Sequence, residues 1–92
     1  MARFYFDLYD GGVVYSDEEG LDYPHAMAAR DFAIKSARGL MAGDINNGRL
    51  CLSCHIEVRD DQGVVVTTVN FSDTVEVSGL TRTGRRRVPL AR

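Results

Sequence analysis

Residues 50–58 read LCLSCHIEV, and this stretch decides how the rest of the chain is interpreted. Its apolar residues alternate with other residues along its whole length: Leu50, Leu52, Cys54, Ile56 and Val58. A two-residue period is typical of a strand with one buried face. The alternation therefore predicts a strand over 50–58, with Cys54 in the core and Cys51 on the opposite face.

The same stretch contains the spacing C-x-x-C-H at Cys51, Cys54 and His55, which is the pattern for covalent haem attachment. A strand points residues three apart to opposite faces, so these two thiols are not expected to hold one porphyrin. Zinc bound by Cys51, His55 and His25 would lack a fourth ligand. Cys51 and His55 would lie roughly 13 Å apart along the strand, too far for a nucleophile and its base. We therefore expect two free thiols, no catalytic residues, no metal and no cofactor.

Further strands are predicted on both sides of this stretch. A turn at 60–63 leads to a β-branched segment, 64–71, with a further extension through Val75 and Val77. Near the N-terminus, Phe4, Phe6 and Leu8 alternate with polar residues and tyrosines up to the turn 10–12, and 13–15 should return as a second strand.

Between the two hairpins, an alanine-rich segment predicts one helix. Asp22 is the expected N-cap, Pro24 lies in the expected first turn, and Gly43 is the expected stop. Small and apolar residues recur every three or four positions and should form the face that packs on the sheet: Ala26, Ala29, Ala33, Ala37, Leu40 and Met41.

Together these elements predict an α+β fold of order ββαββ, with a four-stranded antiparallel sheet and the helix on one face. Four strands span roughly 19 Å, whereas one helix covers about 10 to 12 Å. Part of the sheet therefore needs other cover, and an exposed edge strand favours pairing. We expect a homodimer that binds a further, unidentified protein partner.

Charge divides the chain into a body and a tail. Residues 1–77 hold all 13 acidic residues and six of the 11 basic ones, and residues 78–92 hold five arginines. We expect a single domain over 1–77 and a basic C-terminal tail over 78–92. Arginines of the tail are candidate phosphate contacts, which gives nucleic-acid binding as the alternative function: Arg82, Arg85, Arg86 and Arg87.

Two further groups of side chains are candidates for a function. Tyr5, Tyr9 and Tyr15 are expected on the outward face of the first hairpin, as an interaction surface or a platform for nucleobases. Acidic residues cluster before the helix and offer a hard cation oxygen ligands, although helix capping accounts for several of them: Asp17, Glu18, Glu19 and Asp22. The start of the chain has no apolar signal segment, and no stretch approaches the roughly 18 apolar residues of a membrane span. We therefore expect a cytoplasmic protein.

Several short motifs resemble a family of short bacterial proteins of unknown function. They are F-x-x-x-D-G within 4–12, D-E-E-G at 17–20, the helix around Ala26, Ala29 and Arg30, and the segments 56–60 and 71–73. The likeness spans roughly residues 3 to 77 and implies a domain without an assigned activity. It does not depend on the cysteines, His55 or the arginine tail.

More loosely, the strand pair followed by an alanine-patterned helix resembles the HicB-type antitoxin domain, which implies a toxin partner and DNA contact. The chain has no recognisable DNA-binding module of that kind. From the sequence we expect a non-enzymatic protein-interaction module.

Overall fold

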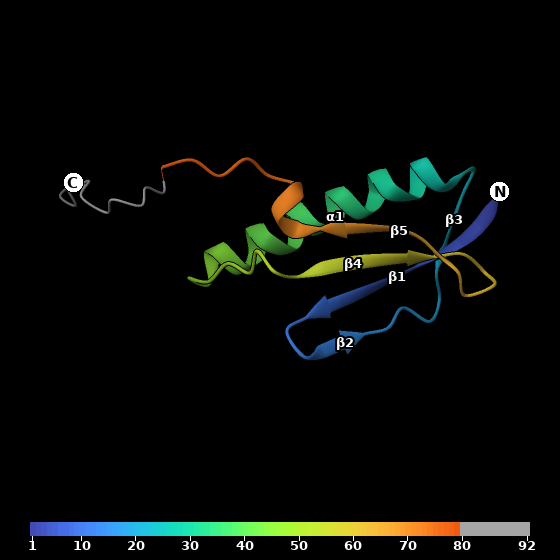
Figure 1. The fold of residues 1–92 in the computed structure, drawn as a ribbon, viewed down its shortest axis with the longest axis horizontal. Coiled ribbons are helices and arrows are strands. Elements are labelled where there is room, and N and C mark those ends of the chain that lie inside the picture. Colours follow the sequence, from blue (N-terminus) through green and yellow to red (C-terminus); the bar gives the residue numbers. More distant parts are fainter. Residues whose placement is uncertain (80–92) are drawn as a thin grey trace.

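An antiparallel sheet carries one long helix on one face in the computed structural model, which describes residues 1–79 (Figure 1). The elements follow in the order β1 (Ala2–Asp10), β2 (Val13–Tyr15), β3 (Leu21–Tyr23), α1 (Ala26–Asn46), β4 (His55–Arg59), β5 (Val65–Asn70) and the 3₁₀ turn η1 (Phe71–Asp73). The sheet has five strands in the order β2-β1-β4-β5, with β3 paired to β1. The α+β class is confirmed.

The first hairpin forms as predicted. Asp10 pairs with Val13 across Gly11 and Gly12, and Gly11 has a φ of 63°. A positive φ is costly for residues with a Cβ, which explains the glycine in this two-residue turn.

The short strand β3 was not predicted, and it changes where the helix begins. Asp22 pairs with Arg3 of β1 and is not the helix cap. Because a residue before proline favours extended backbone, Tyr23 stays in β3 and the helix starts only after Pro24. The cap is His25, whose Nδ1 accepts a hydrogen bond from the Ala28 N–H at 3.2 Å.

The other end of the helix also differs from the prediction. Gly43 lies inside α1, which continues to Asn46. Ala29, Ala33, Ala37 and Met41 are buried as expected. Leu40, however, is 44% exposed and lies off the packed face. Because alanine projects so little, α1 approaches the sheet closely along the alanine stripe.

The strand predicted over 50–58 is confirmed only in its second half. β4 begins at His55, and its buried residues are Ile56 and Val58. Residues 50–54 form a turn instead of extended chain. The alternation of apolar residues therefore overestimated the strand by five residues at its N-terminal end.

The last strand is close to its predicted range, but its extension is wrong. β5 ends at Asn70 because the chain turns into η1, where the Phe71 N–H donates to the Cys54 carbonyl at 2.9 Å. Val75 and Val77 lie beyond η1 and belong to no strand. Although α1 has 21 residues, no helix in the described part of the chain is apolar enough to span a bilayer.

Candidate functional site

The sheet face turned away from α1 carries a row of polar and aromatic side chains. Register places three residues of β1 opposite three of β4, as the pairs Tyr5 with Arg59, Asp7 with Glu57 and Tyr9 with His55. Their neighbours along β4, Ile56 and Val58, are buried beneath the helix. Since side chains alternate along a strand, these six residues form one surface, which we call the open face.

Asp7 and Arg59 form the centre of the open face. Asp7 is only 5% exposed, and its carboxylate accepts hydrogen bonds from Arg59 at 2.6 and 3.2 Å. It also accepts one from the Asp17 N–H at 2.9 Å. Hydrogen bonding to Arg59 holds the pKa of Asp7 below its ordinary value, against the opposing effect of burial. The pair is therefore charged at neutral pH.

The remaining groups of the open face are engaged with one another. The rings of Tyr9 and His55 stack at 4.6 Å, and His55 Nε2 lies 3.4 Å from a Glu57 carboxylate oxygen. Hydrogen bonding to Glu57 raises the pKa of the Tyr9 hydroxyl. The Arg59 guanidinium lies over the Tyr5 ring, 5.4 Å from its centroid. The aromatic faces that would stack nucleobases are thus partly occupied within the chain.

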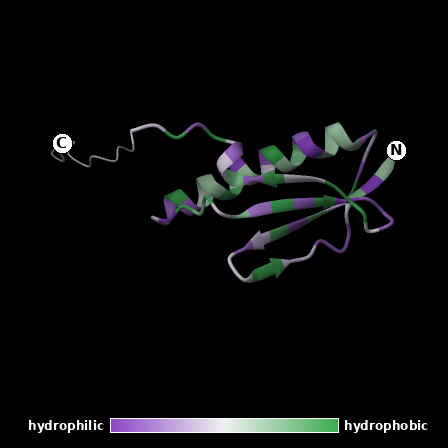
Figure 2. Cartoon of the chain, in the orientation of Figure 1, coloured by the Kyte–Doolittle hydropathy of each residue, from purple (hydrophilic) through white to green (hydrophobic). Residues whose placement is uncertain are grey.

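Tyr15 does not share this surface with Tyr5 and Tyr9. It pairs with Leu8, which packs against the core, whereas Val14 pairs with Tyr9. The expectation that all three tyrosines lie on one face is therefore wrong for Tyr15. Tyr15 stands on the outer strand β2, where all three residues are about half exposed: Val13 51%, Val14 48% and Tyr15 55%. Figure 2 shows β2 as an apolar strand at the edge of the sheet.

Cys51 and Cys54 form a disulfide bond, which contradicts the expectation of two free thiols. Their Cα atoms are 5.9 Å apart. The error follows from the strand boundary, because a turn at 51–54 brings together two side chains that a strand would separate. Cys54 is buried as predicted, at 3% exposure, and its Sγ lies 3.4 Å from an Asp10 carboxylate oxygen.

Neither histidine joins the cysteines. In the described residues, the one group of three metal-ligand side chains within mutual reach is Asp10, Cys51 and Cys54. His55 lies on the open face, and His25 caps α1. The C-x-x-C-H spacing therefore does not correspond to a site that gathers two sulfurs and an imidazole.

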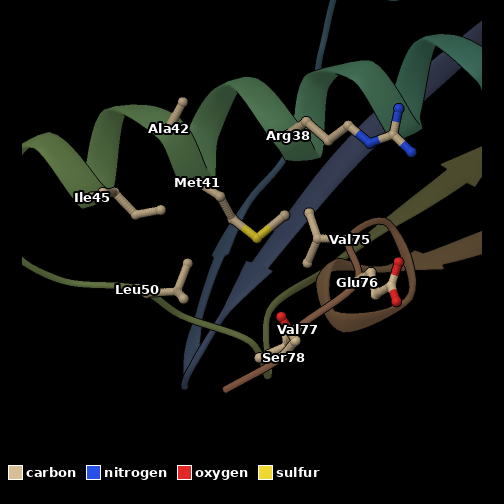
Figure 3. A pocket seen from close by; sticks show the side chains of 9 residues that line it. All are labelled: Arg38, Met41, Ala42, Ile45, Leu50, Val75, Glu76, Val77 and Ser78. Carbon is tan, nitrogen blue, oxygen red and sulfur yellow. The ribbon is translucent and has the colours of Figure 1, made fainter. Parts of the chain in front are cut away.

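An apolar groove lies where the extension of the last strand was expected (Figure 3). It has a volume of about 450 Å³. Met41 and Ile45 point into it from α1, toward Leu50 and Val75 (Figure 3). Its lining residues are Arg38, Met41, Ala42, Ile45, Leu50, Val75, Glu76, Val77 and Ser78.

Residues 3–72 match a family model described as a domain of unknown function, DUF6894. The chain belongs to the DUF6894 family. Apart from Ala2, the matched residues include every described strand and α1, which confirms the resemblance inferred from the motifs. No curated protein and no solved structure matches the chain significantly.

The D-E-E-G motif of this DUF6894 domain has a structural role. Asp17 accepts hydrogen bonds from the Phe6, Glu19 and Gly20 N–H groups at 3.1 to 3.2 Å. Asp17 thereby supplies a hydrogen-bond acceptor to the β1 backbone at Phe6, between the part of β1 that pairs with β2 and the part that pairs with β3. Gly20 has a φ of 71°, and a Cβ there would lie 2.8 Å from the Phe4 carbonyl oxygen.

The acidic cluster is therefore divided among structural contacts. Asp22 pairs with Arg3 at 3.0 Å, Asp17 holds the connection to β3, and Glu18 and Glu19 are exposed. Within residues 1–79 these carboxylates do not gather around one point. The candidate phosphate contacts of the DUF6894 chain lie outside the described residues: Arg82, Arg85, Arg86 and Arg87.

Proposed function

We propose that this DUF6894 domain is a non-enzymatic protein-interaction module that forms a homodimer through strand β2. The observation that carries the proposal is a run of three half-exposed apolar residues, Val13 to Tyr15, on an outer strand of the sheet. Such a run on an exposed edge strand favours pairing with another strand.

The backbone of β2 is arranged for this pairing. In an antiparallel ladder, pairs that are hydrogen-bonded to each other alternate with pairs whose backbone groups point outward. Asp10 and Val13 close a two-residue turn and are a hydrogen-bonded pair, so the next pair, which contains Val14, is of the outward kind. The N–H and C=O groups of Val14 therefore point away from β1. In a two-fold dimer, Val14 of each copy donates to and accepts from Val14 of the other.

The opposite edge of the sheet is better protected. Arg30 of α1 donates hydrogen bonds to the Thr67 hydroxyl at 2.9 Å and to the Thr68 carbonyl at 3.4 Å. The Arg30 side chain therefore lies against this edge, where it obstructs an incoming strand. Figure 1 shows α1 beside β5, with β2 at the far side of the sheet. These contacts favour β2 as the dimer edge.

The polar groups of the open face support a binding role over a catalytic one. Asp7 is neutralised by Arg59, and His55 is stacked on Tyr9 and faces Glu57. A general base or nucleophile needs a free group aimed at a substrate. We further propose that the protein is cytoplasmic. We also propose that the exposed Tyr15 and its neighbours contact a protein partner.

Two matched variants test the dimer edge. Val14→Arg and Val65→Arg introduce the same charge at strand positions of similar exposure, 48% and 46%. We expect size-exclusion chromatography with light scattering to give a dimer for the wild type and Val65→Arg, and a monomer for Val14→Arg. A wild type that is monomeric at every concentration would overturn the proposal. Loss of the dimer in Val65→Arg but not in Val14→Arg would place the interface at β5.

A further inference from the structure

The environment of the Cys51–Cys54 bridge differs between its two sulfurs. Cys54 is buried at the start of β4 beside the Asp10 carboxylate, whereas Cys51 is partly exposed in the turn that precedes it. The Ser53 hydroxyl lies 3.6 Å from Cys51 Sγ. Cys51 thus has a hydroxyl neighbour and is a partly buried residue at the border of the core, whereas Cys54 has a carboxylate neighbour and lies in the core.

The bridge does little to restrict the unfolded chain. It joins residues three apart in sequence, and the chain-entropy gain from a disulfide grows with the length of the loop it closes. The backbone that follows the bridge is also held independently, since the Cys54 carbonyl accepts from Phe71 and β4 pairs with β1 and β5. We therefore expect the fold to persist when the bridge is reduced.

We propose that Cys51 and Cys54 are a thiol–disulfide exchange site that reacts with small thiols of the glutathione class, with Cys51 as the sulfur that is attacked. The partial exposure of Cys51 gives a small thiol access that the buried Cys54 lacks.

The exchange proceeds in two balanced steps. A glutathione thiolate attacks Cys51 Sγ, forming a mixed disulfide and breaking the Cys51–Cys54 bond, and the electron pair leaves on Cys54 Sγ, which takes a proton from water. A second glutathione thiolate attacks the glutathione sulfur of the mixed disulfide and releases Cys51 as a thiolate. Two glutathiones are oxidised to one glutathione disulfide, and the protein gains two electrons and, once the released Cys51 thiolate also takes a proton from water, two protons.

Asp10 and Ser53 act on the thiolates of the two cysteines in opposite ways. The Ser53 hydroxyl donates a hydrogen bond to a thiolate at Cys51, whereas the Asp10 carboxylate repels negative charge on Cys54 and accepts a hydrogen bond from its thiol. Asp10 is a positioning residue in this scheme. Asp10→Asn removes the repulsion, so the leaving Cys54 sulfur should depart faster and reduction should accelerate about threefold or more.

The full-length oxidised protein is incubated in buffers of defined ratios of reduced to oxidised glutathione, alkylated and weighed by mass spectrometry. We expect a reversible titration between disulfide and dithiol, with an unchanged far-ultraviolet circular dichroism spectrum. A bridge that stays fully oxidised in millimolar reduced glutathione, or that is reduced only when the spectrum shows unfolding, would overturn the proposal.

Single-cysteine variants identify the attacked sulfur. Cys54→Ser, which leaves Cys51, should form a mixed disulfide with oxidised glutathione at least about ten times faster than Cys51→Ser, which leaves Cys54. Equal rates, or a faster reaction at Cys54, would contradict the assignment. Because Cys54 is a core residue, the rate of the wild-type dithiol with oxidised glutathione serves as a second measurement, and Ser53→Ala should slow it while leaving the circular dichroism spectrum unchanged.

Discussion

Arg59 donates two hydrogen bonds to the carboxylate of Asp7, at 2.6 and 3.2 Å, and so joins β4 to β1 across the open face. The same carboxylate accepts from the backbone of Asp17, which ties the connection between β2 and β3 into the sheet. A single buried charge thus organises three segments that are distant in sequence.

Replacing Asp7 should remove a pH-dependent part of the stability. The pKa of Asp7 is lowered in the folded state, chiefly by Arg59, so the folded state binds its proton less readily than the unfolded state. This contribution is complete above the unfolded pKa of about 4 and is lost as pH falls through the lower folded pKa. We expect Asp7→Asn to lower the free energy of unfolding by about 2 kcal/mol at pH 7 and by much less in acid.

Urea unfolding at neutral and acid pH measures this difference. Asp61→Asn, in the exposed turn before β5, is the matched control and should behave as the wild type. The same loss of stability in Asp7→Asn at both pH values would show that the ion pair is not the cause.

Gly20 should be intolerant of any side chain. Its φ of 71° and the approach of the Phe4 carbonyl to 2.8 Å leave no room for a Cβ. We expect Gly20→Ala to lower the free energy of unfolding by about 3 kcal/mol. Gly43→Ala, inside α1 with open space around it, should raise that free energy by up to about 1 kcal/mol. Thermal unfolding of both variants checks this, and similar effects in the two would refute the argument from backbone geometry.

The alanine stripe of α1 should resist larger residues. Ala33 is completely buried between the helix and the sheet. Leucine there forces the two apart, so Ala33→Leu should cost about 2 kcal/mol of unfolding free energy. Ala42→Leu places the same side chain at an exposed position of the same helix and should be nearly neutral. A neutral Ala33→Leu would mean that the helix does not pack closely on the sheet.

Sequence patterns predicted the elements whose burial follows a regular period. The fold class and the main contacts of the fold were predicted from two patterns. One is the alternation of apolar residues in β1 and from Cys54 to Val58, and the other is the helical spacing of Ala29, Ala33 and Ala37. The family resemblance was also readable, because D-E-E-G occupies a connection that needs its aspartate and its glycine.

Features that depend on a few local contacts were not predictable in the same way. β3 is three residues long and lacks any alternation that distinguishes it from a loop. Apolar residues also alternate before Cys54, although the chain turns there and forms no strand. This alternation led to the prediction of a strand and so concealed the disulfide. The one signal that favoured the disulfide was the C-x-x-C spacing itself. The strand interpretation overrode this signal because it placed the two cysteines on opposite faces of a strand.

The pairing of β2 with β2 is tested most directly by hydrogen exchange at the Val14 amide, measured by nuclear magnetic resonance at low and high protein concentration. Because this N–H points away from β1, only a second strand protects it, and its exchange should slow markedly as the concentration rises while the amides between β1 and β4 stay constant. A Val14 amide that exchanges equally fast at both concentrations, in a sample that light scattering shows to be dimeric, would contradict a dimer built on this edge.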